Sequence, residues 1–170
     1  IARRLARSDV IACASPESLD RRGRPQHPRE LEQHDAMVPT FLREVTFLRG
    51  AFGDDEPEGD TVSLVPARSP LSTTHIDTLY AAALHGLGIA GLPSFVAEDA
   101  LLEHALERVL PEWRLFSATI YAAMPTRKHV PARTRVFVDF LVKTFGGEDR
   151  DPWLSAAGCE TRTPGGALKE

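Results

Sequence analysis

Short apolar runs, each ended by turn-forming residues, dominate the first third of this sequence. Residues 9–14 are nearly all apolar and are followed by Ser15-Pro16, a pattern typical of a strand buried on both faces. Pro16 is tolerated in a first helical turn and Gly23 can stop a helix, so a helix is expected between them. The same reasoning predicts one or two helical turns at 29–33 and strands at 36–38, 45–49 and 61–66.

The clearest helical periodicity begins at Thr74. Thr74 and Asp77 have the spacing of a capping box, and Gly86 is suited to a left-handed helix stop. Residues 89–92 then predict a buried strand, and Ser94 could cap a following helix. The apolar face of the first helix is formed by Ile76, Leu79, Tyr80, Ala83 and Leu84.

The last third of the chain predicts two more strands and a final helix. The strands are expected at 106–110 and 118–124, the latter buried, and the helix opens at Pro131. From residue 148 to 170 the sequence has no periodicity, which predicts a disordered tail. The buried face of the final helix is predicted to consist of Val136, Phe137, Phe140, Leu141 and Thr144.

The composition is that of an ordinary globular protein. The chain has 170 residues, 42% of them hydrophobic and 26% charged, with a formal net charge of −4. This charge leaves no basic footprint for nucleic acid, and no apolar run approaches the roughly 18 residues of a membrane span. Cys13 and Cys159 lie in dissimilar surroundings, which favours unpaired thiols and a cytoplasmic location. The opening residues from Ile1 resemble neither a start nor a signal peptide, so we expect a fragment of a longer protein.

Catalytic and metal chemistry lack candidates in the sequence. The six histidines have no ligand spacing, and the acidic segment 53–60 is interrupted by Pro57, so it is interpreted as a solvated loop rather than a calcium site. No Gly-x-Ser-x-Gly elbow is present either. We therefore predict no catalytic residue, no metal site and no cofactor.

Four groups of residues along the chain form an ordered set of motifs. They are Cys13-Ala14-Ser15-Pro16-Glu17-Ser18-Leu19, then Pro28-Arg29-Glu30-Leu31 with His34-Asp35, then residues 83–93 around Gly86-Leu87-Gly88, and finally the segments 109–113, 120–125 and 130–141. In this order they resemble the second half of the effector-binding domain of LysR-type transcriptional regulators, over roughly residues 1–145. One departure is His104, where such proteins often place a helix-ending glycine; histidine can adopt the left-handed conformation at some cost.

The resemblance implies an α/β fold of the type 2 periplasmic-binding-protein kind, with two subdomains, mixed sheets and a cleft between them. The first subdomain would be incomplete here. Its end would occupy residues 1–14, the second subdomain 15–117, and a return strand and helix of the first subdomain 118–147, before the tail at 148–170. The chain would cross between subdomains near Ala14–Ser15 and near Ser117–Thr119.

Hydroxyl side chains at the expected cleft are the candidate effector contacts. Ser15 could bind an effector carboxylate or simply cap the helix at Pro16. Ser72, Thr73 and Thr74 precede a helix N-terminus, which suits a small anion, although Thr74 could be only a cap and the other two only loop. Two further candidates are Thr40, which follows a strand, and Ser94, for which a capping role is the stronger interpretation.

The function implied by the resemblance is ligand sensing. A small-molecule effector, an anion being one possibility, would bind in the cleft and shift the relative orientation of the subdomains. DNA would be bound through an N-terminal helix-turn-helix absent from this chain, and the intact protein would form homodimers or homotetramers. A periplasmic solute-binding protein of the same fold is one alternative, and an enzyme built on this fold is another.

Overall fold

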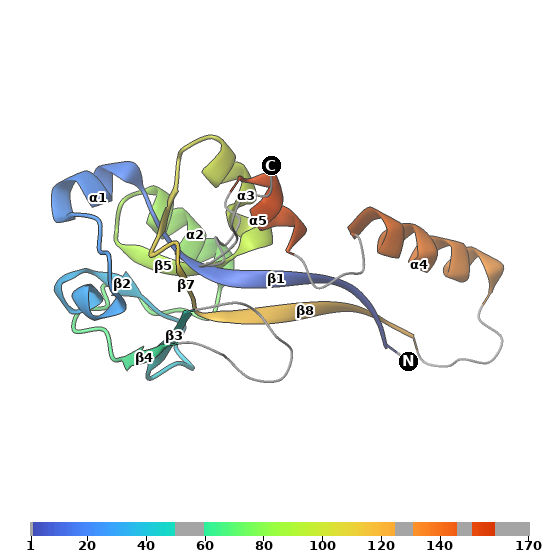
Figure 1. The fold of residues 1–170 in the computed structure, drawn as a ribbon, viewed down its shortest axis with the longest axis horizontal. Coiled ribbons are helices and arrows are strands. Elements are labelled where there is room, and N and C mark those ends of the chain that lie inside the picture. Colours follow the sequence, from blue (N-terminus) through green and yellow to red (C-terminus); the bar gives the residue numbers. More distant parts are fainter. Residues whose placement is uncertain (1, 50–59, 125–130, 146–150, 159–170) are drawn as a thin grey trace, which may run out of the picture.

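The computed structural model describes residues 2–49, 60–124, 131–145 and 151–158. Two long antiparallel strands, β1 (Ala2–Ala14) and β8 (Phe116–Ala123), run side by side through the molecule (Figure 1). Most helices gather around the end of β1 that leads into α1, whereas α4 (Ala132–Phe145) lies apart from them beyond the other end.

Strand β1 organises the larger sheet. The sheet order is β2-β5-β1-β6, with β8 also pairing with β1. Strands β5 (Ile89–Pro93) and β6 (Glu107–Val109) flank the second half of β1 in antiparallel register, and β2 (Ala36–Met37) runs parallel to β5. A smaller sheet has the order β4-β3-β7 and consists of β4 (Thr61–Leu64), β3 (Val45–Arg49) and β7 (Trp113–Arg114).

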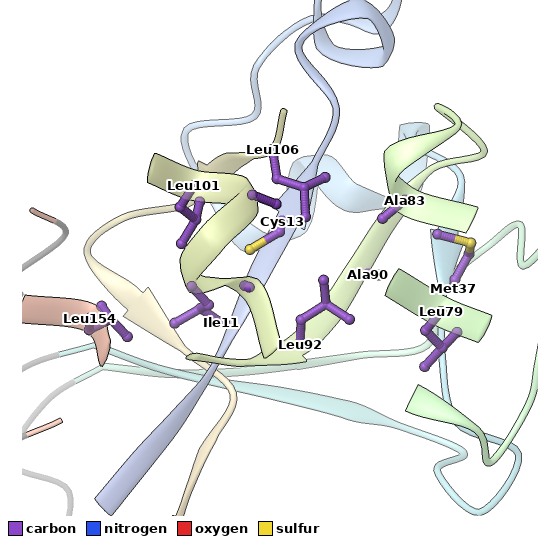
Figure 2. Close-up of a cluster of buried hydrophobic side chains, with 12 residues drawn as sticks. Ile11, Cys13, Met37, Leu79, Ala83, Ala90, Leu92, Leu101, Leu106 and Leu154 are labelled. Atoms are coloured by element: carbon purple, nitrogen blue, oxygen red, sulfur yellow. The ribbon is translucent and has the colours of Figure 1, made fainter. Parts of the chain in front are cut away.

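The core lies on both faces of β1. Ile11 and Cys13 point to the face covered by α2 (Ile76–Leu84) and α3 (Ser94–Leu102), in the cluster shown in Figure 2. Ala12 and Ala14 point to the opposite face, where the smaller sheet packs. All four residues are buried, so the continuous apolar run does form a strand covered on both sides, as predicted.

Several local predictions from the sequence are confirmed. Helix α1 (Pro16–Arg22) ends at Gly23, and a 3₁₀ helix, η1 (Pro28–Gln33), follows it. The backbone is left-handed at Gly86, with φ of 71°, and at His104, with φ of 56°. His104 therefore adopts the left-handed conformation that a glycine would be expected to adopt at that position. Histidine can enter this region of φ and ψ at a modest energetic cost.

Two helix caps were predicted wrongly. Helix α2 begins at Ile76 rather than at Thr74, and the Thr73 hydroxyl accepts a hydrogen bond of 3.1 Å from the His75 amide instead. Ser94 is the first residue of α3 and makes no capping hydrogen bond. Its hydroxyl lies 2.8 Å from that of Ser8 on β1, a tertiary partner that cap statistics cannot reveal.

The predictions of buried surface near the end of the chain were also wrong. On α4, Val136, Phe137 and Phe140 are 68%, 59% and 59% exposed, and Val138 is the residue of this helix that is buried. Strand β8 is half-buried or exposed along its length rather than buried. The physical reason is that no described segment covers these apolar faces, since burial requires a packing partner as well as an apolar pattern.

Part of the predicted disordered tail is helical. Helix α5 (Pro152–Ala156) is capped by Asp151, and its Leu154 belongs to the core cluster. A five-residue helix is too short for its periodicity to be visible in the sequence. The tail beyond residue 158 and most of the acidic segment, residues 53–59, lie outside the described residues.

The pairing of β1 bears on the expected division of the chain. From Ala2 to Val10 the strand pairs with β8, and from Val10 onward it pairs with β5 and then β6. The strand changes neighbours near Val10, which precedes the crossing expected at Ala14–Ser15. On the return path, Ser117 of β8 is paired with Asp9 of β1.

Candidate functional site

A largely apolar pocket of about 320 Å³ is the first candidate site. Its walls come from β1, β5, β3 and the first turn of α2, together with the loop that follows β2. Apolar side chains such as Leu31, Met37 and Phe41 form most of the lining. The polar groups that join them are Thr46, Thr74 and Glu44, and among the described lining residues Glu44 is the single ionisable one.

The topology explains why these segments meet. Strands β2 and β5 are parallel, so the residues that follow them lie at the same edge of the sheet. Pro39 follows shortly after β2, Pro93 is the last residue of β5, and both prolines line the pocket. The segment before α2 is tied to this edge by a β-bridge between Val38 and Ser72.

The predicted contact residues only partly meet at this pocket. Thr74 lines it, and Thr40 lies between two lining residues, Pro39 and Phe41, without lining the pocket itself. Ser72 donates a hydrogen bond of 2.9 Å to the Val38 carbonyl, so its hydroxyl holds the loop in place.

Ser15 and Ser94 are used elsewhere. The Ser15 hydroxyl accepts a hydrogen bond of 3.3 Å from the Ser18 amide and caps α1. It faces Gly86, at the opposite end of β5 from the pocket edge. Ser94 is 1% exposed and bonded to Ser8. Ser15 could have bound an effector or capped α1, and in the structure it caps α1.

A buried polar cluster at the crossing of β1 and β8 was missed at the sequence level. The Asp9 carboxylate accepts from Arg7 Nε at 3.2 Å and from the Ser117 hydroxyl at 2.5 Å. The same hydroxyl accepts from Arg7 at 2.9 Å and from Arg114 at 2.7 Å. The side chains of Arg7 and Asp9 are each 8% exposed, so two guanidinium groups and one carboxylate share a site with little water.

Burial lowers the pKa of the Arg114 guanidinium, and the nearby Asp9 carboxylate partly opposes this. Hydrogen bonds among its members help such a cluster to tolerate burial. It therefore fixes how β8 leaves β7 and joins β1. The sequence signal was weak, since Arg7-Ser8-Asp9 looks like a polar break before an apolar strand.

A second, polar pocket of about 420 Å³ lies near Gly86, where β2 and β5 begin. Arg21, Arg22 and His34 line it, and Arg22 is paired with Asp35 at 2.8 Å. Burial lowers the pKa of His34, and the charge of Arg22 adds to this effect. Arg21 also donates to the Gly86 carbonyl at 3.2 Å. Arg22 therefore pairs with a carboxylate here, and Arg21 bonds to a carbonyl of the turn that follows α2.

Metal binding has no support in the part of the chain that the structure describes, where no group of three or more His, Cys, Asp or Glu side chains is placed to hold an ion. Cys13, the cysteine within this part, is buried. None of the described helices is both long enough and apolar enough to cross a membrane.

Comparison with known proteins identifies what this architecture resembles. A family model described as the LysR substrate binding domain matches residues 1–146. The chain is 30% identical to the transcriptional regulator DmlR of Escherichia coli K12 over 145 residues, covering 85% of this chain and 45% of that protein. It is 32% identical over 141 residues to the transcriptional activator TtdR of Escherichia coli O6, covering 83% and 44%. The chain thus spans less than half the length of these relatives.

Solved structures agree with this comparison. The regulatory domain of AphB from Vibrio vulnificus superposes with a TM-score of 0.71 at 26% identity, covering 85% of this chain and 68% of that one. CrgA from Neisseria meningitidis, described as a LysR-type transcriptional regulator, gives a TM-score of 0.65 at 28% identity, covering 86% and 48%. These structures confirm the predicted fold class, a mixed α/β regulatory domain like those of periplasmic binding proteins.

Proposed function

The chain belongs to the LysR substrate-binding domain family of transcriptional regulators, and from this premise we propose that its apolar pocket binds a small effector. The observation that carries the proposal is the pocket itself. A cavity of about 320 Å³, mostly apolar and lined by a few polar groups, has the dimensions and character of a small-molecule site.

The lining indicates how an effector would be oriented. An apolar body would pack on Met37, Phe41 and the neighbouring side chains, and a polar group would face Thr74. Thr74 precedes α2, whose N-cap residue, His75, makes no capping hydrogen bond with its side chain. An anionic group on the effector would be best placed there, near the positive end of the helix.

Effector binding would act through the crossing strands. The pocket is lined by Val10 of β1 and Phe116 of β8, which are paired with each other. They lie where the partner of β1 changes from β8 to β5. A ligand that contacts them differently in two orientations of the surrounding parts would shift the balance between those orientations. The response would reach DNA through a helix-turn-helix elsewhere in the intact homo-oligomeric protein.

The function proposed is regulatory rather than enzymatic or transporting, because the relatives named are transcriptional regulators. We likewise propose a cytoplasmic location, where such a regulator would meet DNA.

The pocket is tested by ligand titration of the chain with two probes of similar size, 2-phenylethanol and phenylacetate, monitored by NMR chemical shifts. Binding of either probe should shift resonances of Phe41 and Thr74. Thr74→Val should weaken binding several-fold, since it removes a hydroxyl but keeps the shape. Thr78→Val, the same exchange at an exposed α2 position outside the pocket, is the control. Shifts confined to other residues would refute the assignment.

A further inference from the structure

Helix α5 lies beyond the segment that the family model matches, which ends at residue 146. It nevertheless packs against α3 and β1 rather than extending away from the fold (Figure 1). Its contacts therefore lie outside the segment that the family model matches.

Asp151 connects helix α5 to strand β1. One carboxylate oxygen accepts hydrogen bonds from the Trp153 and Leu154 amides, at 3.1 and 2.9 Å, and so caps α5. The other oxygen accepts from the backbone amide of Asp9 at 2.6 Å. Asp151 is 8% exposed, and a short charge-assisted bond in such surroundings is among the stronger kinds.

The apolar side chains of α5 join parts of the fold that are distant in sequence. Leu154 is buried in the core cluster with Ile11 and Leu101 (Figure 2). The Trp153 ring contacts two phenylalanine rings. Its centroid lies 5.7 Å from that of Phe95, near the start of α3, and 5.8 Å from that of Phe145, at the end of α4. One five-residue helix thus contacts α3, α4 and β1 at once.

The contact point on β1 is also where the strand changes neighbours. The Asp9 side chain belongs to the polar cluster with Arg7 and Ser117, while its amide is bonded to Asp151. The adjacent Ser8 is bonded to Ser94 at the start of α3. Residues 8 and 9 are therefore held from both sides, and α5 supplies one of those sides.

We propose that residues 151–156 form a strap that fixes α4 in one orientation relative to α3 and the larger sheet. Opening the strap frees α4 to move about the end of β1. The proposal that these residues hold α4 is argued from the contacts of Asp151, Trp153 and Leu154 and does not depend on the proposed function. Its regulatory consequence, that it sets the balance between the orientations an effector selects, rests on the proposed function.

The strap is tested by a distance measurement within the chain. Spin labels at Val136→Cys on α4 and Leu102→Cys on α3, both exposed sites, are introduced with Cys159→Ser. The unaltered strap should give one narrow distance distribution, and Trp153→Ala should broaden it. Ser155→Ala, at an exposed position of the same helix, should leave it narrow. An unchanged distribution in Trp153→Ala would overturn the proposal.

Hydrogen exchange provides a second test that does not require the tryptophan variant to fold. Asp151→Ala removes both acceptor oxygens, so the cap of α5 and the hydrogen bond to the Asp9 amide are lost together. This change should accelerate exchange of the Asp9 amide about tenfold or more, with the Leu79 amide unaffected. Equal acceleration at both amides, or none at Asp9, would overturn the strap. Neither measurement uses a ligand, so failure of the pocket assignment is separately detectable.

Discussion

Two glycines, Gly86 and Gly88, lie between α2 and β5. Replacing each by alanine should lower the free energy of unfolding by different amounts. Gly86 has φ of 71°, a conformation that costs an L-residue about 1–2 kcal/mol. A Cβ there would lie 3.2 Å from an Arg21 guanidinium nitrogen, which can move because it ends a flexible side chain. Gly88 is not left-handed, but a Cβ there would lie 2.4 Å from the Asp35 carbonyl oxygen.

The clash at Gly88 cannot be relieved cheaply. The same Asp35 oxygen accepts the hydrogen bond of 2.8 Å from the Ile89 amide that aligns β2 with β5. Moving it by most of an ångström would weaken that bond and shift strands that line the apolar pocket. We therefore expect Gly88→Ala to cost about 3 kcal/mol or more, at the upper end for overpacking, and Gly86→Ala about 1–2 kcal/mol.

Urea unfolding of the 170-residue chain, followed by tryptophan fluorescence, measures this difference. For a slope of about 2 kcal/mol per molar urea, the two midpoints should differ by about 0.5–1 M. Gly86→Asn should recover part of the loss, since asparagine tolerates the left-handed region, whereas Gly88→Asn should recover none. Gly23→Ala, with φ of 90° and open space around it, reports backbone strain alone. Equal costs for Gly86→Ala and Gly88→Ala would refute the reasoning.

Two further predictions concern protonation and association. The pKa of His34 is lowered in the fold by burial and by Arg22 from an ordinary value of about 6.5, so the unfolded chain binds more protons and stability is lost as pH falls below that value. Urea midpoints at pH 5.5 and 7.5 should thus differ more for the wild-type chain than for His34→Gln, and parallel changes would contradict this. The exposed face of α4 should make the chain self-associate, and Phe137→Ser with Phe140→Ser should raise the monomer fraction in sedimentation. A wild-type chain that is already monomeric and melts reversibly would count against it.

Local sequence was a good guide wherever a residue's own backbone preference decides the outcome. Pro16 and Gly23 bound α1, Gly86 ends the α2 segment, and the apolar run at 9–14 forms the doubly covered strand. It was a poor guide to hydroxyl groups. Thr74 and Ser94 have the spacing of caps, yet one lines a pocket and the other bonds to Ser8 across the sheet.

By itself, the sequence determined the order and kind of most elements, the α/β class and the family. The elements depend on hydrophobic periodicity and on the φ preferences of proline and glycine, which act within a few residues. The family was identified by the resemblance of four groups of residues to known regulators. Tertiary structure alone decided which polar groups met: Arg7, Asp9 and Ser117 at the crossing, and Asp151 against the Asp9 amide. It also decided which apolar faces were covered, as α4 shows, because burial is a property of two surfaces and a sequence pattern describes one.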